Sequence, residues 1–215
     1  MKSSRTILLV SLFAVAFAFV ESSVVVYLRL LYYPEGFAFP LKPALMSQMI
    51  LELSREFATI VMLAAVGMIA GRSRWRRFSY FMIAFGVWDI FYYVWLKVIL
   101  NWPSSLFEWD ILFLIPVPWI GPVVAPVLVS IVMIAGGWLI ITKEEESGKF
   151  TATKSAIILS LVGSSLVIAS FLLDPDASLR FQKPKPYRYE LLVLSMICYA
   201  AAFIVTSRSS KQAKI

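Results

Sequence analysis

Three charged side chains interrupt an apolar segment of the sequence, "LELSREFATIVML". The charges are Glu52, Arg55 and Glu56, and most of their neighbours are Leu, Ile, Val, Met and Phe. At about 100° per residue, these side chains share one face of a helix with Thr59, and the opposite face is apolar. In a membrane, such a helix turns its polar face toward other helices and its apolar face toward lipid.

Two further acidic residues are predicted to lie at the depth of this cluster. Glu21, Glu56 and Asp89 fall near the midpoints of three consecutive apolar segments, each within about 4 Å of the bilayer centre at a rise of about 1.5 Å per residue. Arg55 is beside them, and Glu52 is about one turn nearer the surface. Three helices therefore bring acidic groups to one level.

Charges at this depth are costly. Insertion scales assign roughly 2.5–3.5 kcal/mol to an Asp, Lys or Arg at a helix centre, so Glu21, Arg55, Glu56 and Asp89 together cost on the order of 10 kcal/mol before pairing. Arg55 can pair with one or two carboxylates, which leaves an excess of acids. We therefore expect at least one carboxyl group to be protonated near neutral pH, or a cation to be bound.

Side chains beyond Asp89 extend the predicted site. Two tyrosines follow Asp89 on its own helical face and offer hydroxyl groups. Lys97 and Arg29 lie nearer the surface, where their aliphatic stems can reach the headgroups. The same network could also act only as a contact that fixes helix register. The predicted binding residues are Glu21, Glu52, Arg55, Glu56, Asp89, Tyr92, Tyr93 and Lys97, and no catalytic residue is assigned.

The composition excludes several classes of protein. With 60% apolar residues, 15% charged residues and a mean hydropathy of +0.81, the chain is more apolar than a soluble domain and is predicted to be an integral membrane protein. The absence of histidine excludes His-ligated haem or zinc and a Ser-His-Asp triad, and a single cysteine excludes an intrachain disulfide. No cofactor is predicted, although a bound cation is possible, and a divalent metal would need all-oxygen ligands.

Apolar segments of roughly 20 residues recur along the chain, and each is long enough to cross about 30 Å of hydrocarbon. The first segment is too long for a signal peptide and is interpreted as an uncleaved helix. We predict an all-α fold, a polytopic membrane helix bundle that forms a single domain over 1–215. The six predicted transmembrane helices span 6–31, 45–70, 78–100, 121–142, 155–173 and 190–206.

An apolar segment between the third and fourth spans is too short and too rich in proline for another crossing. Ser105 and Glu108 have the spacing of a capping box, and Pro116 would end a helix that starts there. We predict a short helix over 105–115 that is interfacial or re-entrant on the outer face.

The formal net charge of +7 is interpreted as a topology signal rather than as a nucleic-acid site, because Lys and Arg cluster in the connections between spans. Twelve of the 20 cations fall on the side of the two chain ends and seven on the other side, with Arg55 inside a span. This balance predicts a plasma (inner) membrane protein with cytoplasmic N- and C-termini. The basic, Pro-rich segment 180–190 is either a solvated connector or a contact to headgroups or a partner.

Three functions fit this pattern. The first is a small transporter or channel-like protein in which the carboxylates relay protons or hold a cation, for which a homodimer would be expected. The second is an accessory or assembly subunit of a larger membrane complex. The third, and the least favoured, is an intramembrane enzyme that acts on a lipid or isoprenoid. An Asp or Glu side chain would then be the general acid or base.

Overall fold

The computed structural model describes residues 3–42, 45–173 and 182–212, and within them it contains six helices and a two-stranded hairpin. Each helix is long and apolar enough to cross a membrane, which is compatible with a multi-pass membrane protein. The prediction of six long apolar helices is confirmed, with ends that differ by a few residues. Lys2, Arg180 and Lys214, which entered the predicted charge balance, lie outside the described residues. The elements are α1 (Ser3–Tyr32), α2 (Met46–Ala70), α3 (Arg74–Leu100), β1 (Trp109–Phe113), β2 (Trp119–Pro122), α4 (Val124–Ser147), α5 (Lys154–Leu172) and α7 (Tyr189–Gln212).

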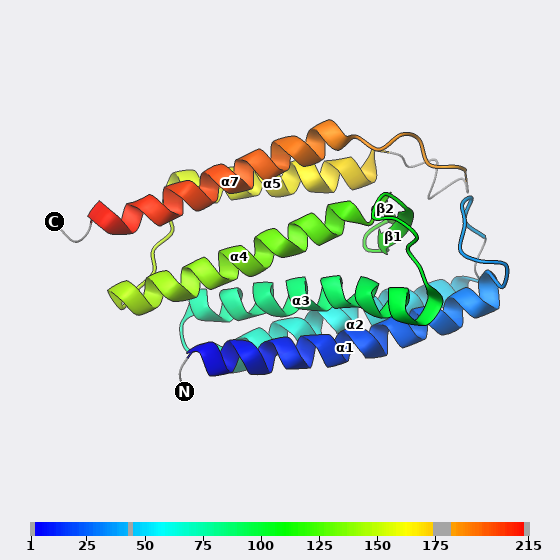
Figure 1. Cartoon of the computed structure of the whole chain (residues 1–215), viewed down its shortest axis with the longest axis horizontal. Coiled ribbons are helices and arrows are strands. Elements are labelled where there is room, and N and C mark those ends of the chain that lie inside the picture. The colour runs from blue at the N-terminus through cyan, green and yellow to red at the C-terminus, as the bar shows by residue number, and fades with distance from the viewer. Residues whose placement is uncertain (1–2, 43–44, 174–181, 213–215) are drawn as a thin grey trace.

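The helices lie roughly parallel or antiparallel to one another in a single elongated bundle (Figure 1). Helices α1, α2 and α3 pack on one side, α4 lies next to α3, and α5 and α7 form a pair beyond α4. The two chain ends lie at the same end of the bundle, which we call the terminal end. The β1–β2 hairpin lies at the opposite end, the hairpin end. Both termini are therefore on one side of the membrane if all six helices cross it.

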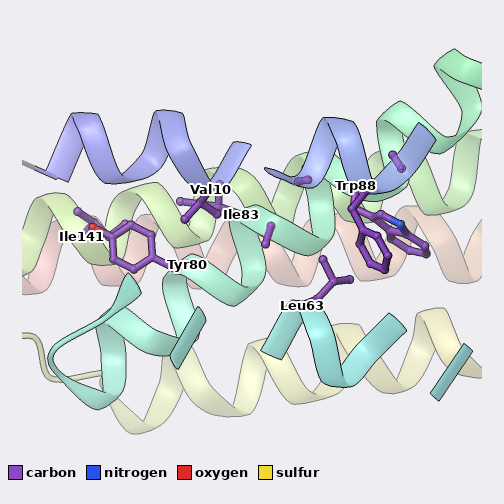
Figure 2. Close-up of a cluster of buried hydrophobic side chains, with 10 residues drawn as sticks. Val10, Leu63, Tyr80, Ile83, Trp88 and Ile141 are labelled. Carbon is purple, nitrogen blue, oxygen red and sulfur yellow. The ribbon is translucent and has the colours of Figure 1, made fainter. Parts of the chain in front are cut away.

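Helix α3 is the central element of the first group. Helices α1 and α2 each make far more contacts with α3 than with each other. The core between them contains Val10, Leu63, Ile83 and Trp88 among its buried side chains (Figure 2). Ala14 and Ala18 belong to the same core and are fully buried, and their small side chains at a spacing of four residues allow close helix packing. A seam with few contacts consequently remains between α1 and α2.

Two glycines, Gly86 of α3 and Gly137 of α4, allow the backbones of these two helices to approach each other closely. A Cβ atom at Gly137 would lie 2.7 Å from the carbonyl oxygen of Ser79, and one at Gly86 would lie 2.6 Å from the carbonyl oxygen of Ser130. Real Cβ atoms essentially never come so close to another heavy atom. Gly136 differs, because a Cβ atom there would meet only the flexible end of Met82, at 3.1 Å.

The predicted helix over 105–115 is wrong, because this segment enters an antiparallel hairpin. The capping-box residues do form local bonds: the Glu108 N–H donates to the Ser105 carbonyl oxygen at 3.0 Å, and the Phe107 N–H donates to Ser105 Oγ at 3.2 Å. These bonds close a turn instead of starting a helix. Aromatic and β-branched residues then favour a strand that pairs with residues 119–122. The register pairs Trp109 with Pro122, Asp110 with Gly121 and Ile111 with Ile120.

The α3–α4 contact predicts opposite outcomes for two neighbouring glycines. Gly137→Ala should destabilise the protein by about 1–3 kcal/mol, because the new methyl group would meet backbone atoms that cannot move independently. Gly136→Ala should be tolerated, since Met82 can change rotamer. Thermal unfolding of both variants in the same detergent measures the difference. Equal unfolding temperatures would contradict the proposed close contact.

Candidate functional site

A cavity of about 640 Å³ lies at the hairpin end of the seam, between α1, α2, α3, the hairpin and the 33–42 segment. Seven of the eight predicted binding residues line it. Three charged residues that were not among those eight also line it, namely Arg29, Lys42 and Asp110. The acidic residues of the wall are Glu21, Glu52, Glu56, Asp89 and Asp110, and the basic ones are Arg29, Lys42 and Arg55.

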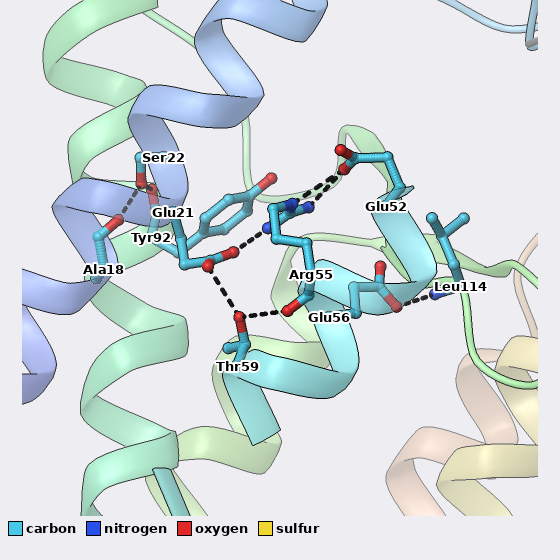
Figure 3. Close-up of polar contacts among 9 residues, drawn as sticks. All are labelled: Ala18, Glu21, Ser22, Glu52, Arg55, Glu56, Thr59, Tyr92 and Leu114. Carbon is cyan, nitrogen blue, oxygen red and sulfur yellow. Dashed lines mark hydrogen bonds and ion pairs between the residues drawn. The ribbon is translucent and has the colours of Figure 1, made fainter. Parts of the chain in front are cut away.

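Arg55 links α2 to α1 across the seam (Figure 3). Its guanidinium forms an ion pair with Glu21 of α1, and its Nε and Nη2 donate to Glu52 Oε2 at 3.0 and 2.8 Å. Thr59 Oγ1 donates to the second oxygen of Glu21 at 2.8 Å. Glu21 is only 5% exposed, so both its oxygens are satisfied by α2 rather than by water. The charges in "LELSREFATIVML" therefore hold two helices together on their polar faces.

Glu56 has a different partner. Its Oε2 accepts a hydrogen bond of 2.9 Å from the backbone N–H of Leu114, just after β1 (Figure 3). No cationic side chain forms an ion pair with Glu56 among the described residues. The carboxylate therefore connects α2 to the hairpin through a single neutral donor.

Asp89 lines the same cavity but points its carboxylate toward α4. Its Oδ2 accepts a hydrogen bond of 2.8 Å from Ser130 Oγ, and Ser130 is buried. The structure therefore places Asp89 on the cavity wall without bringing it into contact with Arg55. Like Glu56, it forms no ion pair with any cation in the described part of the chain.

A buried ion pair that the sequence analysis did not predict joins α1 to the hairpin. Arg29 Nη2 lies 2.9 Å from Asp110 Oδ1, and the two residues are 8% and 2% exposed. The Arg29 guanidinium also stacks 3.6 Å from the ring centroid of Trp102 and 4.5 Å from that of Phe37. Arg29 was expected to extend to the headgroups; it is buried instead, because Asp110 and these rings replace its hydration.

Burial raises the pKa of Asp110 to about 6, and the nearby Arg29 charge limits this rise. The adjacent guanidinium therefore favours the ionised form of Asp110. One oxygen of Asp110 and one nitrogen of Arg29 are buried without a hydrogen-bond partner among the described residues. The pair is consequently a costly one that holds the hairpin in place.

The remaining predicted residues divide between the cavity and its surroundings. Tyr92 and Tyr93 line the cavity, and Tyr93 is buried against Trp102. Lys97 does not line it: its Nζ donates to the carbonyl oxygens of Asn101 and Pro103, at 3.3 and 3.0 Å, beyond the end of α3. Lys42 instead provides a cation at the rim, where its Nζ donates to the Tyr32 carbonyl oxygen at 2.7 Å.

The geometry does not assemble a metal centre from acidic groups. Within residues 3–42, 45–173 and 182–212, no three carboxylate or thiol side chains come together in a way that could hold a metal ion. Glu21 and Glu52 share Arg55, whereas the other three carboxylates of the cavity bind donors on different elements. The cavity is therefore a mostly apolar chamber with acidic side chains distributed over its walls.

Comparison with known proteins gives no relative: no protein-family model matches the chain, and neither a curated protein nor a solved structure does.

The Arg29–Asp110 pair predicts a large difference between single and double replacement. Asp110→Asn leaves a buried guanidinium without a counter-charge and should cost about 3–5 kcal/mol of stability. Replacing both residues by leucine removes both buried charges and should restore most of that loss. Thermal unfolding of the purified variants provides the measurement. A double variant as unstable as Asp110→Asn would show that packing, rather than the buried charge, sets the cost.

Proposed function

We propose that this chain is a small transporter or channel-like protein that binds a proton or a cation in the hairpin-end cavity and carries it across the membrane. The observation that supports this proposal is the excess of acids: five acidic and three basic residues line the cavity. Like charges cannot all remain ionised in a low-dielectric wall without a counter-charge. A proton or a bound cation supplies that charge.

The partners of the basic residues favour a cationic ligand over an anionic one. Arg29 is paired with Asp110, Arg55 with Glu21 and Glu52, and the Lys42 ammonium group binds a carbonyl oxygen. An anion would have to break one of these contacts.

A cation can approach Glu56 and Asp89, whose partners are a backbone N–H and a serine hydroxyl. Trp88 and Tyr92 add aromatic faces to the wall, which also attract cations.

The orientation in this proposal follows from the distribution of basic residues. Arg72, Arg74, Arg76 and Arg77 all lie at the terminal end, which we place in the cytoplasm of a plasma (inner) membrane. The cavity then faces the outside. Toward the cytoplasm, the buried side chains of Leu63 and Ile83 close the path. Transport would require the core along the seam to open, as in alternating access.

The separation of the carboxylates gives little support to the enzyme hypothesis. General acid–base catalysis needs an acid and a base that both reach the reacting atoms of one substrate. A metal-assisted reaction needs several ligands close together. The described acids of the cavity are instead bound to separate elements. An accessory subunit remains the outcome to be inferred if the purified protein moves no ion.

The excess carboxylates are the groups to test. Glu56→Gln and Asp89→Asn keep the size of each side chain and remove its charge. The protein would be reconstituted into liposomes that contain a pH-sensitive or a sodium-sensitive dye, and a potassium gradient with valinomycin would drive proton or sodium entry. We expect the wild-type flux to exceed that of empty liposomes. The flux of the double variant should be at least about tenfold lower than that of the wild-type protein, because a proton-transfer group is lost.

Glu190→Gln is the matched control, because Glu190 is exposed at the start of α7 and does not line the cavity. It should leave the flux unchanged. Thermal unfolding of all variants separates function from stability. Lowered unfolding temperatures with an intact flux would assign the carboxylates to helix register alone, and the absence of flux in the wild-type protein would contradict the proposal.

A further inference from the structure

A second cavity lies on the same seam, at the terminal end. It has a volume of about 480 Å³ and is formed by the start of α1, the end of α2 and the start of α3. Leu9, Phe13 and Ile69 form part of its wall, and their side chains are 48%, 39% and 85% exposed. Because these residues lie on apolar helices, their exposed surfaces face lipid. The terminal-end groove is therefore open to the hydrocarbon of the bilayer.

The charged side chains of this groove are cationic. Arg72 and Arg76 line it, and no acidic residue does so among the residues that the structure describes. Arg76 is held in place by Glu144, at 3.0 Å from its Nε, and by Ser3 Oγ, at 3.0 Å from its Nη1. Arg72 is exposed and contacts no acidic side chain within the described ranges. The Arg76 guanidinium at the mouth of the groove is thus held in place, and the Arg72 guanidinium is left to pair with a ligand.

The wall of the groove includes a tyrosine side chain. Tyr80 is 1% exposed, packs in the core close to Val10, and lines the groove (Figure 2). Its hydroxyl has no hydrogen-bond partner among the described residues. Tyr80 follows Arg76 by one helical turn, so it lies about 6 Å deeper along α3. A hydroxyl group that lines the groove without a partner in the described part of the protein can donate a hydrogen bond to an acceptor that enters the groove.

We propose that the terminal-end groove binds an anionic phospholipid. Arg72 and Arg76 contact the phosphate at the membrane surface, and the Tyr80 hydroxyl donates to an ester oxygen of the glycerol backbone below it. The acyl chains lie along Leu9, Phe13 and Ile69. This order of cation, hydroxyl and apolar wall matches the order of groups in a phospholipid from headgroup to tail.

The combination of groups distinguishes this ligand from two others. Inorganic phosphate could bind the arginines, but it would leave Tyr80 and the exposed apolar wall without a partner. The cation of the proposed transport function is disfavoured here, because the charged side chains of the groove, Arg72 and Arg76, are both positive. The residues that argue for a lipid site are therefore different from those of the hairpin-end cavity.

Lipid binding to the purified full-length chain can be measured by native mass spectrometry in detergent, with phosphatidylglycerol and phosphatidylcholine of identical acyl chains. The wild-type protein should bind the anionic lipid more tightly. Arg72→Gln should weaken that binding by about fivefold, the contribution of one basic side chain near an anionic lipid, while Arg72→Lys should retain most of it. Arg74→Gln is the matched control, since Arg74 is exposed on the same turn but does not line the groove.

Two further measurements test the apolar half of the site. Ala70→Phe places a ring in the groove without changing the charge, and should weaken the binding of phosphatidylglycerol. Millimolar inorganic phosphate should fail to displace the bound lipid. Equal affinity for the two lipids, equal losses in Arg72→Gln and Arg74→Gln, unchanged binding in Ala70→Phe, or displacement by phosphate would each overturn the proposal.

Discussion

The contact of Arg55 with Glu21 and Glu52 is the constraint on which the arrangement of the first three helices depends. Helices α1 and α2 both pack on α3 and make few contacts with each other, so the space between them is not filled by side chains along its whole length. Arg55 and Thr59 bridge that space by binding Glu21. Because the bridge is polar, it fixes the distance between the helices while it leaves room on its hairpin side, where the cavity lies. An apolar contact at this point would have closed the seam.

The six helices could be predicted from the sequence because the thickness of the bilayer sets the length of each apolar segment. The hairpin could not be. Ser105 and Glu108 have helix-capping spacing and do form local bonds, but the next residues pair with a strand that begins ten residues after Trp109. Local spacing cannot reveal such a partner. A short apolar run fits a strand or a helix about equally well, and the pairing decides between them.

The site was predictable to the extent that it depends on helix periodicity. Their positions along the helices place Glu21 and Arg55 at one level and Glu52 about one turn nearer the surface, and the structure brings the three into contact. Periodicity does not say which neighbour a side chain faces, so it could not show that Asp89 binds Ser130 of α4. It also could not connect Arg29 with Asp110, because that pair requires the hairpin to fold back over α1. Tertiary packing therefore distributes acids that the sequence only places at similar depth.

The two cavities on the seam carry opposite charge, and this difference follows from the bridge between them. All five acids of the hairpin-end cavity lie on the hairpin side of the bridge or beside it, whereas the terminal-end groove holds two arginines and no acid among the described residues. In the proposed function, a cation that enters from the hairpin end would be attracted as far as Glu56 and Asp89, and the arginines beyond the packed core would then repel it. An anionic lipid on Arg72 and Arg76 would neutralise that repulsion. Occupation of the groove would thus lower the electrostatic barrier for a cation that passes the core, which couples a structural lipid to the proposed transport without any contact between the two ligands.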